Sequence, residues 1–307
     1  MPAAYLEAHR KGRLQRSIER SLRWMAKCTL CPRFCRVNRI EGELGFCRTG
    51  RLAVVASYGP HFGEESPLVG SNGSGTIFFS HCNLLCSFCQ NYEISHGGEG
   101  VPVTAGQLAN IMVDLQSRGC HNINFVTPSH VIPQILEALP AAVEKGLRVP
   151  LVYNCGGYDR VSALGLLNGI VDIYMPDFKF WDSQVADQLC GAPDYPERAR
   201  KAFREMHRQV GDLQIESRGI ARRGLLVRHL VMPDELAGTN GVLKFLADEI
   251  GKNTYVNVMD QYRPCGDAIG DPAIGRRITH NEYVEALQMA KDVGLTRLDK
   301  RLRSWLL

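Results

Sequence analysis

From residue 75 onward the sequence alternates between two kinds of segment, and this alternation is the strongest constraint on the fold. Short runs rich in β-branched and aromatic residues predict strands, and each is followed by apolar residues at helical spacing. Six such units in succession require a parallel sheet with right-handed crossovers. Periodicity alone does not decide whether that sheet is flat or curled. The expected strands cover residues 75–80, 122–126, 149–153, 171–175, 224–231 and 254–259, and the expected helices cover 104–119, 131–145, 162–167, 196–210, 242–250 and 282–293.

Three cysteines directly follow the first of these strands, with the spacing Cys82-x3-Cys86-x2-Cys89. Three thiolates so close together can bind three irons of a 4Fe–4S cluster and leave the fourth iron without a protein ligand. An open metal position is where a substrate or cofactor binds. Strand ends also carry the chemistry in barrel-like α/β folds. Structural zinc is the alternative, although zinc ligands usually come as two C-x2-C pairs.

A second group of cysteines precedes the alternating region. Cys28, Cys31, Cys35 and Cys47 lie in a short stretch rich in turn formers. A segment this small buries no core of its own, so a bound metal would stabilise it. Four thiolates suit zinc or a second, fully ligated Fe–S cluster equally well, and four unligated thiols are the remaining interpretation. A closed site of this kind would be structural or would relay electrons.

Composition narrows the compartment and the partners. The chain has eleven cysteines among 307 residues and no apolar run of the secretory type near its start, which favours a reducing, cytoplasmic location. A formal charge of +4 is too weak to indicate nucleic acid. The sequence contains no stretch of about 18 apolar residues, so we expect no segment that spans a membrane. Leu14, Ile18, Leu22 and Met25 predict an amphipathic helix, which we expect to dock on the protein's own core.

Seven stretches run in order from residue 28 to about residue 290: CTLCPRFCRVNR, GSGTIFFSHCNLLCSFCQNYEISH, HNINFVTPSH, PLVYNCGGYD, VDIYMPDFKF, RGLLVRHLVMP and VNVMDQYRP. They resemble the radical SAM superfamily and, within it, the PflX-type proteins, which are similar to pyruvate formate-lyase activating enzymes. The resemblance implies a partial (β/α)6 TIM-type barrel whose three clustered cysteines hold a 4Fe–4S cluster. S-adenosylmethionine would bind the open iron and be cleaved reductively to a 5′-deoxyadenosyl radical.

The resemblance also implies which residues bind the cofactor. Phe88 precedes the last cluster cysteine and Asn91 follows it, although an Asn at a turn often bonds local backbone. The activating enzymes bind the cofactor's amino group with a Gly-Gly-Glu after the second strand. Here that place reads Thr127-Pro-Ser129-His130, which offers two hydroxyl oxygens and an imidazole nitrogen instead. Capping of the following helix is the alternative role for His130.

The end of the fourth strand matches the activating enzymes more closely. Met175, Asp177 and Lys179 resemble a strand end at which the aspartate lies near the cofactor carboxylate through a monovalent cation. Asn154 and Cys155 fall where the other ligands of that site lie. A local ion pair between Asp177 and Lys179, worth little at a surface, is the alternative.

Two polar residues, Arg228 and His229, interrupt the apolar fifth strand. Alternation turns one of them toward the barrel interior, where a charge needs a partner. Arg228 could bind the cofactor's ribose or carboxylate, whereas packing explains His229 equally well. Gln261, Tyr262 and Arg263 end the sixth strand and could face the substrate.

The expected organisation has four parts: an N-terminal amphipathic helix in residues 1–27, a cysteine-rich metal-binding segment in 28–70, the radical SAM barrel in 71–295 and a tail in 296–307. The resemblance implies a reductant such as flavodoxin or ferredoxin, and hydrogen abstraction from a glycine of a partner protein. Radical modification of another peptide or of a small metabolite is an open alternative. The alternative outside the enzymes is a non-catalytic binding module whose cysteines hold structural zinc.

Overall fold

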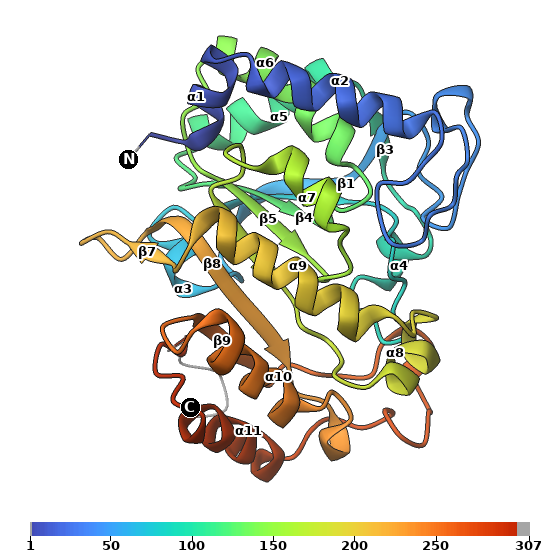
Figure 1. Ribbon diagram of the computed structural model, residues 1–307, viewed down its shortest axis with the longest axis vertical. Helices are drawn as coiled ribbons and strands as arrows, with labels where there is room; N and C mark the ends of the chain where they lie inside the picture. Colours follow the sequence, from blue (N-terminus) through green and yellow to red (C-terminus); the bar gives the residue numbers. More distant parts are fainter. Residues whose placement is uncertain (1, 300–307) are drawn as a thin grey trace.

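A parallel sheet forms the centre of the protein, as shown by a computed structural model that describes residues 2–299. Its six parallel strands stand side by side in chain order and are paired only with their neighbours, so the sheet is an open, partial (β/α)6 barrel. This arrangement confirms the α/β class and the expected barrel (Figure 1). The strands are β2 (Ser74–Phe79), β4 (Ile123–Val126), β5 (Leu151–Cys155), β6 (Ile173–Pro176), β8 (Ala221–Leu230) and β9 (Tyr255–Met259).

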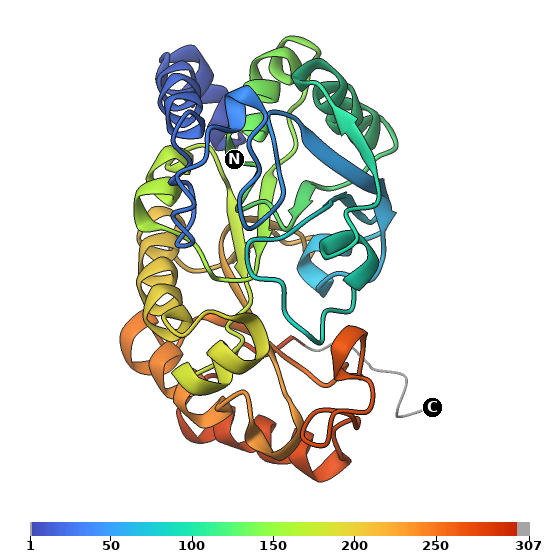
Figure 2. The ribbon, with the colours of Figure 1, turned by 90° about the vertical axis from the view of Figure 1, so that its right-hand side faces the viewer.

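The helices expected between these strands are all present and cover the sheet from outside. Figure 2 shows this outer layer running from α2 in blue through α9 in yellow to α10 in orange. The predicted capping box at Thr104 and Gln107 starts α5. The expected helices are α5 (Ala105–Ser117), α6 (Ile132–Glu144), α7 (Val161–Leu167), α9 (Tyr195–Val210), α10 (Thr239–Phe245) with its π-helical continuation Leu246–Ile250, and α11 (His280–Asp292). An additional helix that was not expected, α8 (Ser183–Cys190), lies between β6 and α9.

Three strands and five further short helices were not expected from the sequence. The antiparallel strand β1 (Ala53–His61) pairs with β2 and with β3 (Val101–Val103), so the sheet begins before the expected boundary at residue 71. Gly59 and Pro60 within β1 make its sequence untypical of a strand. The other elements are β7 (Gln214–Ile215), α3 (Ser66–Val69), α4 (Tyr92–Ser95) and the single-turn 3-10 helices at Arg39–Glu41, Pro233–Glu235 and Gly266–Ala268, of which the first precedes β1.

The N-terminal residues form two helices, α1 (Ala4–Arg10) and α2 (Arg13–Met25), which are separated by Gly12 at a φ of 67°. Leu14, Ile18 and Met25 are buried, and α2 lies against α6 and α7 (Figure 1). The amphipathic helix therefore docks on the protein's own core, as predicted. Within residues 2–299, no helix is both long and apolar enough to cross a membrane.

At the other end, Val256 of β9 forms backbone hydrogen bonds with Arg297 and Asp299. Part of the expected tail thus extends the β9 edge. Residues 300–307 of that expected tail lie outside the described residues.

Strand β8 places its two polar residues on opposite faces, as alternation predicted. Arg228 faces the inside of the barrel, where it bonds Asp177 and Asn154. His229 is fully buried on the other face, where its Nδ1–H donates to the Phe178 carbonyl and its Nε2 accepts from the Thr239 hydroxyl. His229 is therefore a packing residue with both ring nitrogens satisfied.

Burial lowers the pKa of His229 to about 4. An unfolded histidine titrates near pH 6.5, so between about pH 6.5 and pH 4 the unfolded chain binds a proton that the folded chain does not. The free energy of unfolding should fall in this window by up to about 1.4 kcal/mol per pH unit as pH decreases. Denaturant titrations of metal-free protein should show a weaker fall for His229→Gln. The exposed His280→Gln serves as control, and equal pH slopes in all three proteins would contradict this prediction.

Candidate active site

The carboxyl ends of the parallel strands surround a cavity of about 370 Å³. It lies where active sites form in barrels of this kind. Most residues expected to act on the cofactor line it: Cys82, Cys86, Phe88, Cys89, Asn91, Thr127, Asn154, Asp177, Lys179 and Arg228. Cys155 and Gln261 line it as well. The fold thus brings together side chains from the ends of all six parallel strands.

The three cysteines stand on the loop after β2, which is shaped to present their sulfurs. His81 and Leu85 take left-handed backbone conformations, with φ of 69° and 53°. The Leu84 N–H donates to the Sγ of Cys82 at 3.3 Å, and the Ser95 hydroxyl donates to the Sγ of Cys89 at 3.3 Å. Such bonds stabilise a thiolate.

Burial raises the pKa of Cys82 to about 12, so the free side chain is a protonated thiol and becomes a ligand only with a metal. Among residues 2–299, no three His, Cys, Asp or Glu side chains are placed to hold one metal ion. Cys82, Cys86 and Cys89 instead line the cavity at the strand ends. This donor set fits a polynuclear iron–sulfur cluster with three cysteine ligands.

A buried charge network occupies the opposite wall of the cavity. Arg228 donates from Nε to the Oδ1 of Asp177 at 2.6 Å, and Lys179 donates from Nζ to Oδ2 at 2.8 Å. Arg228 also donates from Nη2 to the Oδ1 of Asn154 at 2.7 Å. Burial works against the charged form of Asp177, but the two cations outweigh it and lower its pKa. Only 14% of the Asp177 side chain is exposed. The network is therefore largely buried and is not the surface ion pair considered as the alternative.

Two carboxylates that the sequence did not single out also reach this network. Glu64 and Glu65, in the loop between β1 and β2, lie 3.7 Å and 4.0 Å from Nη1 of Arg228. Asn257 donates to Glu65 at 2.8 Å, and burial raises the pKa of Glu65. Neither residue follows a parallel strand, so no strand-end signal marks them. They enter the barrel because β1 turns back at the open side of the sheet.

Three expected cofactor-binding residues do not line this cavity. Ser129 is buried behind it and hydrogen-bonds the Asp159 carboxylate. Met175 is fully buried in an apolar cluster with Leu68 and Val152. His130 is buried beside the N-terminal cysteines and neither caps α6 nor faces the strand-end cavity. The chain turns at Thr127, whose φ is 60°, and this turn directs the residues after it away from the site.

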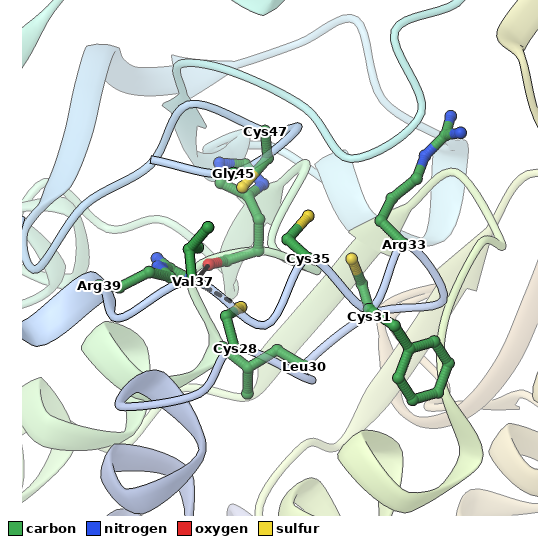
Figure 3. A pocket seen from close by; sticks show the side chains of 11 residues that line it. Cys28, Leu30, Cys31, Arg33, Cys35, Val37, Arg39, Gly45 and Cys47 are labelled. Carbon is green, nitrogen blue, oxygen red and sulfur yellow. Dashed lines mark hydrogen bonds between the residues drawn. The ribbon is translucent and has the colours of Figure 1, made fainter. Parts of the chain in front are cut away.

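The four N-terminal cysteines surround a second, smaller cavity (Figure 3). Cys28, Cys31 and Cys35 come from one loop and Cys47 from the returning chain. The Phe46 N–H donates to the Sγ of Cys35 at 3.3 Å. Burial raises the pKa of Cys31 to about 12, so the thiol of Cys31 is protonated without a metal. The expected clustering of these cysteines is present.

Arg33 lies between Cys31 and Cys35 in the sequence. Its side chain joins the cysteine-rich segment to the loop after β2. Its guanidinium donates to the carbonyls of Asn83 at 2.9 Å, Leu84 at 3.3 Å and Cys190 at 2.7 Å, and also to that of Gly191. The same group lies over the rings of Phe46 and Tyr158. One side chain thus ties the loop of Cys82, Cys86 and Cys89 to both the first segment and the end of α8.

Replacing Arg33 by alanine should loosen that loop, because the carbonyls of Asn83 and Leu84 lose a charged donor. We expect hydrogen exchange at the amides of residues 84–89 to become at least about tenfold faster, which corresponds to about 1.4 kcal/mol. Arg160→Ala is the matched control. Arg160 also anchors the first segment, through Thr29 and Phe34, and has no bond to the loop. Equal exchange in the two variants would show that Arg33 does not hold the loop.

Comparison with known proteins gives one relative by sequence. No protein-family model matches the chain. The uncharacterized protein MJ0674 of Methanocaldococcus jannaschii is 32% identical over 298 residues, which cover 94% of this chain and 82% of that protein.

Solved structures give weaker similarities. A radical SAM methyltransferase from Sphaerobacter thermophilus has a TM-score of 0.48 at 14% identity, over 72% of this chain and 64% of that one. The FeFe-hydrogenase maturase HydG from Carboxydothermus hydrogenoformans has a TM-score of 0.49 at 13% identity, over 73% of this chain and 51% of that one. This chain thus spans about half to two thirds of their length, and similarity of this size carries no conclusion about activity. By its sequence relationship, the chain belongs to the family of the M. jannaschii protein MJ0674.

Proposed function

We propose that this protein is a radical SAM iron–sulfur enzyme. The observation that carries the proposal is one cavity lined both by the C-x3-C-x2-C cysteines and by a buried Asp177–Arg228–Lys179 network. Three cysteines offer a cluster one fewer ligand than it has irons, which leaves a position for a cofactor. The ordered motifs that resemble PflX-type proteins support the same proposal.

Cys82, Cys86 and Cys89 would hold the 4Fe–4S cluster. When bound, the cluster and S-adenosylmethionine together supply a 5′-deoxyadenosyl radical for hydrogen abstraction. The protein's own part is to shape and shield the cavity. Phe88 is buried against the rings of Phe180 and Tyr262 and closes the site on the side of the last cysteine.

The charge network would bind the polar ends of the cofactor. Arg228 and Lys179 supply positive charge suited to a carboxylate, and Asn154 and Asn91 supply amide groups. Both oxygens of Asp177 already accept bonds from internal cations. A monovalent cation is therefore not needed to balance that carboxylate in this structure.

Reductive cleavage of S-adenosylmethionine tests the proposal directly. Anaerobically reconstituted protein treated with dithionite should form 5′-deoxyadenosine and methionine, and Cys86→Ala should abolish both products because the cluster loses a ligand. Cys120→Ala is the control, since Cys120 is a buried cysteine outside both cysteine groups. Product formation by Cys86→Ala at the rate of the unchanged protein would refute the assignment.

Arg228→Gln should weaken S-adenosylmethionine binding by about ten- to a hundredfold, because a charge-assisted bond is worth roughly 1.5–3 kcal/mol. Equilibrium dialysis with the reconstituted protein measures the affinity. Arg276→Gln is the matched control. Arg276 also pairs with two carboxylates, Asp234 and Glu282, but lies at the surface away from the cavity. Equal affinity in both variants would exclude Arg228 from the cofactor site.

For the substrate, we propose a glycine of a partner protein, with a flavodoxin- or ferredoxin-type protein as electron donor. The resemblance to activating enzymes supports this choice. The long connection between β9 and α11 also borders the cavity, since Asp267 N–H donates to the Ser87 carbonyl at 2.9 Å and Gln90 bonds the Gln261 carbonyl. This connection also exposes 73% of the apolar side chain of Ile269.

Deuterium transfer separates a protein substrate from a metabolite. The reconstituted enzyme is incubated with the protein fraction of source cells grown on α-deuterated glycine. We expect deuterium in the 5′-deoxyadenosine, because the radical takes a hydrogen from the glycine α-carbon. Deuterium that appears only with the small-molecule fraction would overturn the protein substrate and favour a metabolite.

A further inference from the structure

We infer that Cys28, Cys31, Cys35 and Cys47 hold a second iron–sulfur cluster, one in which every iron has a cysteine ligand. The inference goes beyond the proposed function, because it does not depend on what the cysteines after β2 bind. Four observations at the N-terminal cavity carry it: the backbone that gathers the thiols, an unbalanced buried cation, an unpartnered buried nitrogen, and the placement of the sulfurs.

The backbone around this cavity is shaped to gather the cysteines. Phe34, Arg36 and Arg48 all take left-handed conformations, with φ of 46°, 60° and 50°. Non-glycine residues adopt these only where surrounding structure compensates the strain, which is typical of ligand sites. Gly45 has no room for a side chain, since a Cβ there would lie 2.7 Å from the Cβ and 2.8 Å from the Sγ of Cys35.

A buried cation beside these thiols lacks a counter-charge. Arg39 is 1% exposed, and its Nη1 lies 4.0 Å from the Sγ of Cys28 (Figure 3). Its remaining bonds go to the carbonyls of Gly50 and His130. Within residues 2–299, no carboxylate forms a salt bridge with it. Four neutral thiols would leave this charge unbalanced, whereas four metal-bound thiolates carry the negative charge that it requires.

An unpartnered nitrogen lies in the wall of the same cavity. His130 is 1% exposed and lines the space between the cysteines. Its Nε2 lies 2.9 Å from the Ser80 carbonyl and must therefore carry the proton of that bond. Its Nδ1 is buried and has no hydrogen-bond partner among the described residues. A buried polar atom without a partner indicates a bound group that completes the site.

The placement of the sulfurs favours a cluster over zinc. Zinc needs all four sulfurs within about 2.3 Å of one point. In the described part of the chain, no set of three potential ligands is placed to hold a single ion, and this includes the four N-terminal cysteines. The same is true of the cysteines after β2. Each set lines a cavity, and Figure 3 shows the four N-terminal cysteines around theirs. Sulfurs that lie around a cavity suit four separated irons better than one ion.

The two cysteine groups are also neighbours. Cys47 and Leu85 line one shared cavity, and Arg33 bonds the carbonyl of Leu84. A closed cluster beside the active-site loop offers no open iron for a substrate. Its position suits the passage of single electrons toward the site or the support of that loop.

Metal analysis of a variant without the active-site ligands tests the inference. The Cys82→Ser, Cys86→Ser, Cys89→Ser triple variant is reconstituted anaerobically with iron, sulfide and an equal amount of zinc. We expect about four iron and four sulfide per chain. Adding Cys31→Ser and Cys35→Ser should abolish them, and adding Cys120→Ser should not. One zinc without sulfide, or no metal at all, would overturn the inference.

The unchanged chain, measured in parallel, separates this inference from the proposed function. About eight irons per chain would support both sites. If the unchanged chain binds four irons and the triple variant binds none, the active-site cluster is supported and the second cluster is refuted. If the triple variant keeps all the iron of the unchanged chain, the second cluster stands and the proposed function fails.

A second measurement covers the case in which the added Cys31→Ser and Cys35→Ser changes cause misfolding. Arg39→Gln removes the buried cation but no ligand, and Arg39→Lys keeps the charge. In the triple-variant background the reduction potential of the cluster should be lower with Gln than with Lys, because a nearby positive charge favours the reduced form. Equal potentials would refute the counter-charge role of Arg39 and the argument built on it.

Discussion

The pairing of Asp177 with Arg228 and Lys179 inside the barrel is the interaction on which the site depends. Three charges from two adjacent strands are largely removed from water, and each would be costly to bury alone. Because Arg228 also bonds Asn154, the network joins the ends of β5, β6 and β8. It holds two cations toward the cavity that Cys82, Cys86 and Cys89 also line. A cofactor with a carboxylate is the kind of molecule that such a wall accepts.

Arg33 extends this organisation to the other end of the site. It stands between two N-terminal cysteines and bonds carbonyls of the loop after β2, so one side chain couples two cysteine groups that are far apart in sequence. A guanidinium suits this role because its planar N–H groups reach several acceptors at once. Metal binding in the first segment would therefore stiffen the active-site loop.

Much of the fold and part of the site were predictable from the sequence. The six strands, their helices and the clustering of Cys82, Cys86 and Cys89 after β2 follow from local patterns, which report burial and spacing along the chain. Asp177 and Arg228 were also identified, because a charge at the end of or within an apolar strand is conspicuous. Glu64 was not singled out, and His130 was expected at the strand-end cavity but lies beside the N-terminal cysteines. Their positions depend on how β1 turns back and on the turn at Thr127, and no periodic pattern encodes either.

The sequence by itself determined the succession of strands and helices, the types of the candidate ligands and the existence of two cysteine groups, because these follow from spacing and side-chain chemistry. Only the tertiary structure decided which polar groups meet. It pairs Asp177 with Arg228, separates His130 from the strand-end cavity, and places Arg39 beside Cys28. The physical reason is that desolvation makes a buried charge or lone pair depend on its neighbours in space, and those neighbours come from distant parts of the chain.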